Sequence, residues 1–258
     1  MTTYLNVSFF GTTIRVLKKF IWFLKSQYGN QKIHTKMIEV FIWIIIVLIL
    51  TTLVAIIAKK HGVEYLIGIF VALVVISNIL ANKIVIFWKW AVPAGLIAYS
   101  ITFFVSNIIN EFYSEKQAKK TVMIGFLANI LLVVLVFIAI RWPSASFWNA
   151  QDEFALILGN TWRIVLGSLI AYIVSQNYDV WSFNLWKKVT KGRYLWLRNT
   201  LSTMLSQLID TVIFVFIAFY GLFPVMPTII GLFIVKVIIA LLDNPFIYFV
   251  RWIYRKIK

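Results

Sequence analysis

The stretch Asn199–Phe214, NTLSTMLSQLIDTVIF, decides the fold class because it combines a membrane-helix pattern with groups that lipid cannot accept. It opens an apolar run that ends near Tyr220, about two dozen residues later, which is long enough to span a membrane. Its polar residues include two amides, four hydroxyls and one carboxylic acid: Asn199, Ser202, Thr203, Ser206, Gln207, Asp210 and Thr211. Lipid offers these groups no hydrogen bonds, so they must face protein or water.

The polar residues of this stretch share one side of the predicted helix. Each residue of an α-helix turns about 100°, so residues three, four and seven apart lie on one face. The positions within about 80° of Asn199 are Ser202, Thr203, Ser206, Gln207 and Asp210. Close packing of membrane helices explains the hydroxyls alone, since Ser and Thr are common at such contacts. Asp210, with Gln207 one turn away, predicts a function, because a carboxylate at mid-membrane costs at least about 2.5–3.5 kcal/mol.

The whole chain has the composition of a membrane protein built of helices. Of its 258 residues, 62% are hydrophobic and 13% are charged, and the mean hydropathy is +0.90. Soluble domains contain about 45–50% apolar residues, and the strict alternation of a membrane barrel is absent. Seven apolar segments approach the length of a membrane span: 37–58, 64–87, 91–110, 118–140, 154–177, 198–220 and 227–250.

These segments predict an all-α polytopic membrane protein, with a six-helix core bundle and an additional N-terminal membrane helix. The expected organisation has three parts along the chain. A basic N-terminal segment occupies 1–36, the extra helix and its loop occupy 37–63, and the core with a short basic C-terminal tail occupies 64–258.

The distribution of basic residues predicts the orientation of the core. Lys and Arg gather in alternate connections, near 59–63, 111–120, 178–198 and 251–258. The positive-inside rule places this side, and the carboxyl terminus, in the cytoplasm. Seven spans would then leave the basic amino terminus outside. Either that tail is translocated against its charge or the first span is not a true crossing, and six core spans are favoured.

The charge and the rare residue types exclude several classes of function. A net charge of +16 would suggest nucleic acid as the partner of a soluble protein. Here the basic residues lie at helix ends, so membrane lipid is the expected partner and nucleic acid is not. The chain has no cysteine and two histidines without a metal-binding spacing, so we predict no metal site and no cofactor. It also has no Walker A loop, GxGxxG motif or Ser-His-Asp set, and we expect no enzyme.

Other predicted spans carry polar faces of the same kind. Helical spacing aligns four further sets: Ser77, Asn78 and Asn82; Ser100, Asn107, Asn110 and Glu111; Ser168, Tyr172, Ser175 and Asp179; Lys236 and Asp243. Arg163 lies on the opposite side of its helix from the third set, and it either pairs with an acid or extends to the membrane interface. A flat, uncharged ligand rich in hydrogen-bonding groups, such as a purine-like base, fits this inventory. An amino acid or a vitamin would fit it as well.

Five motifs occur in a fixed order along the predicted core. They are SNILANK (77–83), NIINEFY (107–113), LGSLIAY (166–172), LWLRNTLSTMLSQLIDTVIF (195–214) and KVIIALLDNPFIY (236–248). Together they resemble the queuosine precursor transporter family, also called the vitamin uptake transporter family. The similarity covers roughly 64–250, the six core spans.

The resemblance implies a small-molecule substrate and a membrane. Members of the family take up queuosine precursors for tRNA modification across the bacterial cell inner (plasma) membrane. These are 7-deazaguanine bases such as 7-cyano-7-deazaguanine or 7-aminomethyl-7-deazaguanine. The resemblance also implies a fold related to the substrate-binding components of energy-coupling-factor transporters. Asn107 and Ser114 depart from the family pattern, which usually has an acid and a glycine there, so specificity among the precursors could differ.

Polar residues of the aligned faces are the candidate substrate-binding residues. They are Asn78, Asn110, Glu111, Arg163, Asn199, Thr203, Gln207, Asp210 and Lys236. Asp210 or Glu111 is expected to accept from the N–H and amino edge of the base, and the amides to bond its carbonyl or ring nitrogens. Arg163 and Lys236 would balance the acids. Phe103 or Trp162 would stack on the base.

Several alternatives stay open at the level of the sequence. The ligand could be another vitamin or nucleobase, carried with the help of a partner ATPase. In a different class, Asp210 and Asp243 could form the aspartyl pair of an intramembrane enzyme, or the chain could be a structural membrane protein. The energy source, an external ATPase partner and a homo-oligomeric state are equally open.

Overall fold

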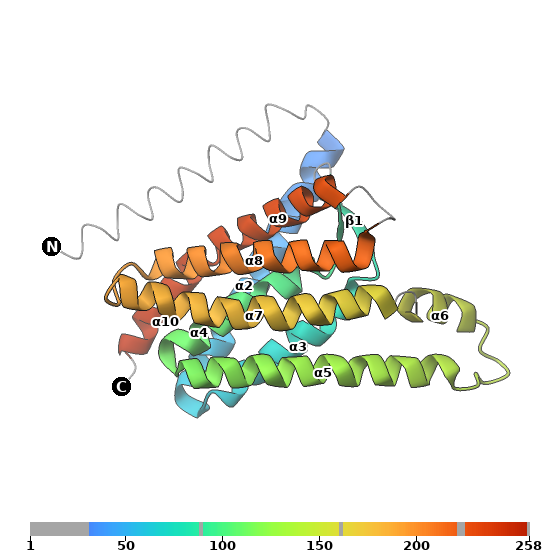
Figure 1. Ribbon diagram of the computed structural model, residues 1–258, viewed down its shortest axis with the longest axis horizontal. Helices are drawn as coiled ribbons and strands as arrows, with labels where there is room; N and C mark the ends of the chain where they lie inside the picture. The colour runs from blue at the N-terminus through green and yellow to red at the C-terminus, as the bar shows by residue number, and fades with distance from the viewer. Residues whose placement is uncertain (1–30, 88–89, 160–161, 221–224, 257–258) are drawn as a thin grey trace. The chain divides into compact units, whose positions relative to one another are not determined.

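The computed structural model describes residues 31–87, 90–159, 162–220 and 225–256 as helices with one small hairpin (Figure 1). The helices are α2 Gln31–His61, α3 Glu64–Leu80, α4 Leu96–Phe112, α5 Glu115–Arg141, α6 Gln151–Gly159, α7 Trp162–Val189, α8 Leu195–Phe219, α9 Val225–Leu242 and α10 Asn244–Lys256. The strands are β1 Ile84–Phe87 and β2 Trp90–Pro93. Met1–Ile46 and Val47–Lys258 form two compact units, and the packing described below belongs to the second. Most of the basic segment predicted over 1–36 lies outside the described residues.

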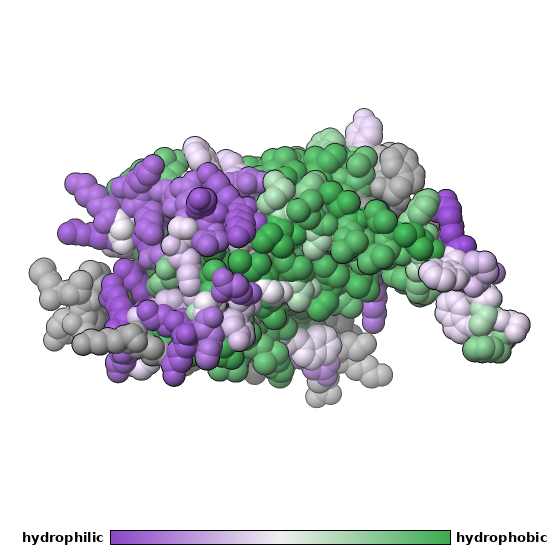
Figure 2. Space-filling view, turned by 90° about the horizontal axis from the view of Figure 1, so that it is seen from below, coloured by the Kyte–Doolittle hydropathy of each residue, from purple (hydrophilic) through white to green (hydrophobic). Residues whose placement is uncertain are grey.

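The described helices include four that are long and apolar enough to cross a membrane: Ile38–His61, Glu115–Arg141, Leu195–Ala218 and Thr228–Lys256. Two shorter apolar helices accompany them, Glu64–Leu80 and Leu96–Phe112. Large apolar side chains remain exposed along α5, including Leu127, Leu131 and Leu135. Figure 2 shows such side chains as a broad green area. Because an apolar surface of this extent needs lipid or another partner to cover it, the chain is the all-α polytopic membrane protein that its composition predicted.

Hydrophilic side chains gather at one end of the second unit, where α7 joins α8 and α5 begins (Figures 1 and 2). Exposed basic residues at this end include Lys116, Lys188 and Lys191. The ammonium of Lys59 lies 5.6 Å from the ring centroid of Tyr254, which brings the turn after α2 to the end of α10. The four basic connections therefore share one side, as the alternation of charge predicted. We call this side the basic end.

Two predicted spans, 64–87 and 91–110, are shorter helices than expected, because a β-hairpin replaces their facing ends. α3 ends at Leu80, and the Asn82 amide donates to the backbone oxygen of Asn78 at 3.2 Å. β1 and β2 then pair antiparallel. Their β-branched and aromatic residues favour strands. The sequence carries no sign of this change from helix to hairpin, because the segment is largely apolar.

The predicted spans 154–177 and 227–250 are also divided. α6 and α7 cover the first span, and α9 and α10 cover the second. Pro245 has no N–H with which to continue α9, whereas it is tolerated in the first turn of a new helix. The backbone oxygen of Asp243 accepts from the N–H of Phe246 at 3.0 Å and so begins α10. Asp243 thereby lies at a buried helix junction, with 1% of its surface exposed.

α4 is the central helix of the second unit. Each of its residues from Ser100 to Asn110 is buried. Around it, α7 and α8 lie side by side, and α9 packs on both α8 and α4 (Figure 1). Gly167 permits the close approach of α7 to α8, because a Cβ there would lie 3.3 Å from the side chain of Ile217. Polar residues of α4, α7, α8 and α9 therefore meet in one interior.

Gly125 provides a test of this packing. A Cβ at this position of α5 would lie 2.3 Å from the Tyr172 hydroxyl and 2.8 Å from the Phe70 ring. We expect Gly125→Ala to lower the free energy of unfolding by about 1–3 kcal/mol, as overpacking of a core does. Unfolding by SDS in mixed micelles would measure it.

The matched control is Gly68→Ala in α3. No heavy atom lies within 4 Å of a Cβ built at Gly68. This substitution should be neutral or stabilise the protein by up to about 1 kcal/mol, because alanine is the better helix former. Equal effects of the two substitutions would contradict the packing of α5 on α3 and α7.

Candidate functional site

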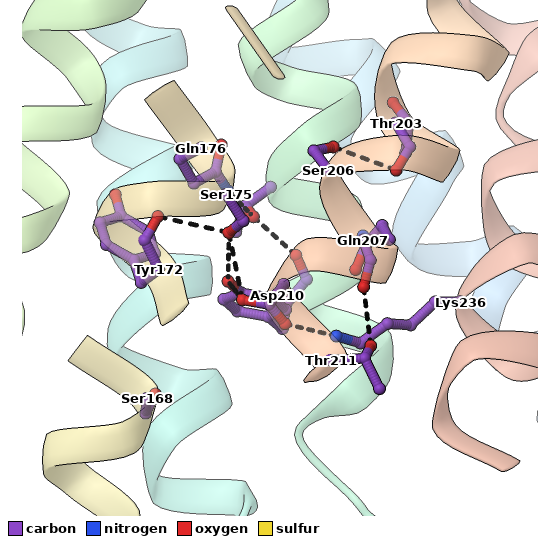
Figure 3. A network of polar contacts seen from close by, with 12 residues as sticks. Ser168, Tyr172, Ser175, Gln176, Thr203, Ser206, Gln207, Asp210, Thr211 and Lys236 are labelled. Carbon is purple, nitrogen blue, oxygen red and sulfur yellow. Dashed lines mark hydrogen bonds and ion pairs between the residues drawn. The ribbon is translucent and has the colours of Figure 1, made fainter. Parts of the chain in front are cut away.

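A buried ion pair joins α8 to α9 and anchors the polar interior. The Lys236 ammonium contacts one carboxylate oxygen of Asp210, and the two residues are 3% and 4% exposed. The other carboxylate oxygen accepts from the hydroxyls of Tyr99 at 2.5 Å and Ser175 at 3.1 Å (Figure 3). Four helices, α4, α7, α8 and α9, thus meet at the Asp210 carboxylate. Its charge is neutralised and both of its oxygens are satisfied.

Two buried glutamine side chains beside this ion pair have polar atoms without a hydrogen-bond partner. Gln207 precedes Asp210 by one helical turn, and neither its Nε2 nor its Oε1 is bonded. Gln176 follows Ser175, and it donates to Thr102 at 2.8 Å while its Oε1 is unbonded. Both residues are 0% exposed, and both lie in the network of Figure 3. A buried polar group without a partner costs about 1–3 kcal/mol, so these amides are suited to bind a ligand.

A second layer of amides lies nearer the basic end. The Asn107 amide donates to Asn199 and to Thr203, both at 3.0 Å. Asn199 in turn donates to Asp243 at 2.7 Å and to Asn244 at 3.2 Å. These bonds join α4 to α8 and α8 to the junction of α9 with α10.

A third cluster closes the interior at the basic end. The guanidinium of Arg198 pairs with Glu111, and Lys187 lies 3.1 Å from the other Glu111 oxygen. Arg198 also donates to the backbone oxygen of Gly192 at 3.0 Å, and it is fully buried. Asn110 belongs to the same region, where its amide accepts from Asn184 at 3.0 Å. Glu111 is therefore held by two cations of α7 and α8.

Asn78 lies in a separate cluster of α3, α5 and α7. Its amide donates to Asn129 at 2.7 Å, and its oxygen accepts from Ser168 at 3.0 Å. Asn78 thus connects three helices. Arg163 is in the first turn of α7, but its side chain and that of Trp162 lie outside the described residues.

Helix geometry separates these clusters along the bundle. Arg198, which holds Glu111, precedes Asp210 by twelve residues of α8, or about 18 Å of helix rise. One purine-sized ligand cannot contact both acids. Asp243 is bonded to Asn199, which lies about 16 Å along α8 from Asp210. The two aspartates therefore do not form an aspartyl pair, whose carboxyl groups must approach to about 3 Å.

The structure adds residues that the sequence-based candidates omitted. Tyr99 and Ser175 bond Asp210, Gln176 lies beside them, and Arg198 pairs with Glu111. The sequence does contain a signal for Arg198 as the partner of Glu111. Arg198 lies in the first turn of the helix that follows a basic loop, and this loop is on the same side of the membrane as Glu111. Tyr99 carried no such signal, since a tyrosine near a helix end is common at membrane interfaces.

The two departures from the family pattern have different structural consequences. Ser114 caps α5, where its hydroxyl accepts from the N–H of Gln117 at 3.1 Å, a role that serine performs well. Asn107 supplies two donors to α8, which a carboxylate could not do. The amide at 107 therefore belongs to the local network and adds no further charge.

Comparison with known proteins agrees on one family. The chain matches the family described as "Putative vitamin uptake transporter" over residues 93–250, from β2 to α10. A "Probable queuosine precursor transporter" of Bacillus subtilis (strain 168) is 31% identical over 213 residues, which are 80% of this chain and 92% of that protein. The "Queuosine precursor transporter" of Escherichia coli (strain K12) is 24% identical over 163 residues, 63% of this chain and 71% of that protein. No solved structure matches the chain significantly.

The buried ion pair leads to a stability prediction. Lys236→Met leaves the Asp210 carboxylate buried without its cation, so it should lower the free energy of unfolding by about 3–5 kcal/mol. The double variant with Asp210→Asn should be more stable than the sum of the two single losses, because the unpaired charge is removed as well. Unfolding by SDS in mixed micelles, arranged as a double-mutant cycle, measures this coupling.

Lys119→Met is the matched control for that cycle. Lys119 pairs with Glu115 at 2.6 Å on the surface of α5, where the two side chains are 51% and 41% exposed. Loss of this pair should change the free energy of unfolding by less than about 1 kcal/mol. Additive effects at Asp210 and Lys236 would contradict the buried ion pair.

Proposed function

Because the chain belongs to the vitamin uptake transporter family, we propose that it imports queuosine precursors, 7-deazaguanine bases such as 7-cyano-7-deazaguanine or 7-aminomethyl-7-deazaguanine. The proposal draws on the names of its curated relatives, which are queuosine precursor transporters. The family and the fold make the protein a multi-pass membrane transporter. We place it in the bacterial inner membrane with the basic end in the cytoplasm, following the positive-inside rule.

The main observation that supports the proposed substrate site is the buried, unbonded amide of Gln207. Its amide is fully buried, both of its polar atoms are unbonded, and it lies one turn from the Asp210–Lys236 pair. A guanine-like base presents N–H and amino donors beside a carbonyl acceptor. One glutamine amide matches a donor and an acceptor of that edge at once, and the Oε1 of Gln176 offers a second acceptor.

The other proposed contacts follow from their distance to Gln207. Asp210 and Lys236 lie at the same level of the bundle as Gln207. Either residue can give up its contact with the other and bond the base instead. Thr203 and Asn199 lie one and two turns further along α8 and bound the site on that side. Phe103 is the candidate for stacking, because it is buried and its ring centroid lies 5.7 Å from that of Tyr99.

Three sequence-based candidates lie outside this level. Asn78 is engaged with Asn129 and Ser168, and Asn110 and Glu111 belong to the cluster at the basic end. We propose that these residues hold the helices in place and do not contact the base. Import would then proceed without chemistry on the substrate, so we propose no enzymatic activity.

Another vitamin or nucleobase is the second candidate for the ligand. The family description names vitamin uptake and favours this reading in general terms. Thermal-shift competition with 7-deazaguanines, purines and common vitamins would separate the two. Stabilisation by a vitamin and not by a 7-deazaguanine would replace the proposed substrate.

Gln207→Leu tests the site in cells that cannot make the precursor. We expect the wild-type chain to restore queuosine in tRNA when the precursor is supplied outside, and Gln207→Leu to abolish this rescue. The substitution should not lower the stability of the protein, because the amide has no protein partner to lose. Uptake of labelled precursor and an SDS unfolding curve together distinguish lost binding from lost folding.

Gln117→Leu is the control with the same chemical change. Gln117 lies in the first turn of α5 near the basic end and is half-buried. Its substitution should leave uptake unchanged. Normal uptake by Gln207→Leu would remove Gln207 from the site.

A further inference from the structure

The buried acids of the bundle differ in whether a cation neutralises them. Asp210 has Lys236, and Glu111 has Arg198 and Lys187. Asp179 and Asp243 are 0% and 1% exposed, yet no ion pair among the described residues includes either of them. Burying an isolated carboxylate in an apolar medium is so costly that such groups are paired or take up a proton. These two acids therefore need a positive charge that the described chain does not supply.

Each of the two carboxyl groups has one bonded and one unbonded oxygen. Oδ1 of Asp179 accepts from the Ser206 hydroxyl at 3.0 Å, and Oδ1 of Asp243 accepts from the Asn199 amide at 2.7 Å. The Oδ2 atoms of both residues are buried and have no hydrogen-bond partner in the described part of the chain. The two bonding partners, Ser206 and Asn199, lie two helical turns apart on one face of α8. The Oδ1 of Asn107, which bonds both Asn199 and Thr203 through its nitrogen, is also buried and unbonded.

Most titratable groups on the surrounding helices have other partners. On α7 the Tyr172 hydroxyl donates to the backbone oxygen of Val122 at 3.0 Å, and on α10 the Tyr248 hydroxyl accepts from the N–H of Trp196 at 3.2 Å. The titratable groups of α8 are Asp210 and Arg198, and those of α4 are Tyr99 and Glu111. All four belong to the two ion-pair clusters described above. α9 contributes Lys236, which contacts Asp210. The buried residues of α5 are Ala118, Thr121, Val122, Gly125 and Asn129, and none of them titrates.

The surroundings of the two acids suit a proton better than a metal cation. The Asn199 nitrogen points at Asp243, and the Asn107 nitrogen points at Asn199 and Thr203. A metal ion needs oxygen ligands around it, whereas these amides direct N–H groups into the region. A proton needs one free carboxylate oxygen, and two are present.

The position of Asp179 connects it to the proposed substrate site. Its partner Ser206 is the residue before Gln207 on α8, and Asp179 lies one helical turn from Gln176 on α7. A change of charge at Asp179 therefore acts on the contact between α7 and α8 that also positions both glutamine amides. Proton binding and substrate binding are coupled when each alters the same helix contact.

We propose that Asp179 and Asp243 form a proton-binding site, with the proton on an Oδ2 atom, that couples uptake of the base to the proton gradient. The proposal rests on the transport function proposed above. A proton enters from the outer side with the base, binds one of the two carboxyl groups so that the pair keeps a single negative charge while the bundle reorients, and leaves on the cytoplasmic side. No bond of the base is formed or broken.

The test uses the full chain in proteoliposomes with labelled 7-cyano-7-deazaguanine, in sodium-free buffer and with the membrane potential clamped. With the outside more acidic, the wild type should accumulate the base about tenfold for each unit of pH difference if one proton accompanies each base. An uncoupler should abolish this accumulation. Asp179→Asn, a neutral replacement of the same shape, should lose accumulation yet still exchange labelled for unlabelled base. Asp243→Asn should behave in the same way, and Asp152→Asn, an exposed acid of α6, should match the wild type.

The outcomes separate the two proposals. Neither exchange nor accumulation by the wild type would overturn the transport function itself. Exchange without accumulation in a pH gradient, or accumulation driven by sodium instead, would overturn proton coupling and leave the transport function standing. Accumulation by both Asp→Asn variants at the wild-type level would overturn the assignment to these residues. Should one variant fail to fold, which lost exchange would reveal, the other decides the assignment.

Discussion

Lipid offers a polar side chain no hydrogen-bond partner. The interior of this bundle is organised by that constraint, because α8 carries a stripe of polar residues that other helices must cover. The stripe from Asn199 to Asp210 has to be covered along its length. α4 covers it with Asn107, α7 with Ser175, and α9 with Lys236. Each of these contacts sets the rotation of a neighbouring helix, because a polar group turned to lipid would lose its partner. The central place of α4 follows from the same requirement.

The charges inside the bundle separate into two kinds with different consequences. A carboxylate paired with a buried cation, as Asp210 is with Lys236, holds the two helices that carry the pair in register. A buried carboxyl group without a cation, such as Asp179, changes its charge when a proton arrives. The first kind holds together the helices around the proposed substrate site. The second kind gives these helices a means to respond to the membrane's proton gradient.

Local sequence patterns predicted which polar residues face the interior, but not which of them bond to one another. Helical spacing placed Thr203, Gln207 and Asp210 on one face, and burial of that face confirms the interpretation. Spacing within one helix does not say which helix packs next to it, so neither Tyr99 nor Arg198 was among the candidates. The hairpin of β1 and β2 was missed because an apolar run has the same composition in a strand and in a membrane helix.

The sequence by itself determined the membrane class, the polar stripe and the family, because each depends on composition, on helical period or on the order of motifs along the chain. The tertiary structure alone decided which groups meet. Tyr99 bonds Asp210 across 111 positions of sequence, and Asn107 bonds Thr203 across 96. Contacts of this kind arise from the packing of helices against one another, and no local pattern encodes their partners. The same packing left Asp179 and Asp243 without a cation among the described residues, which their positions in the sequence did not reveal.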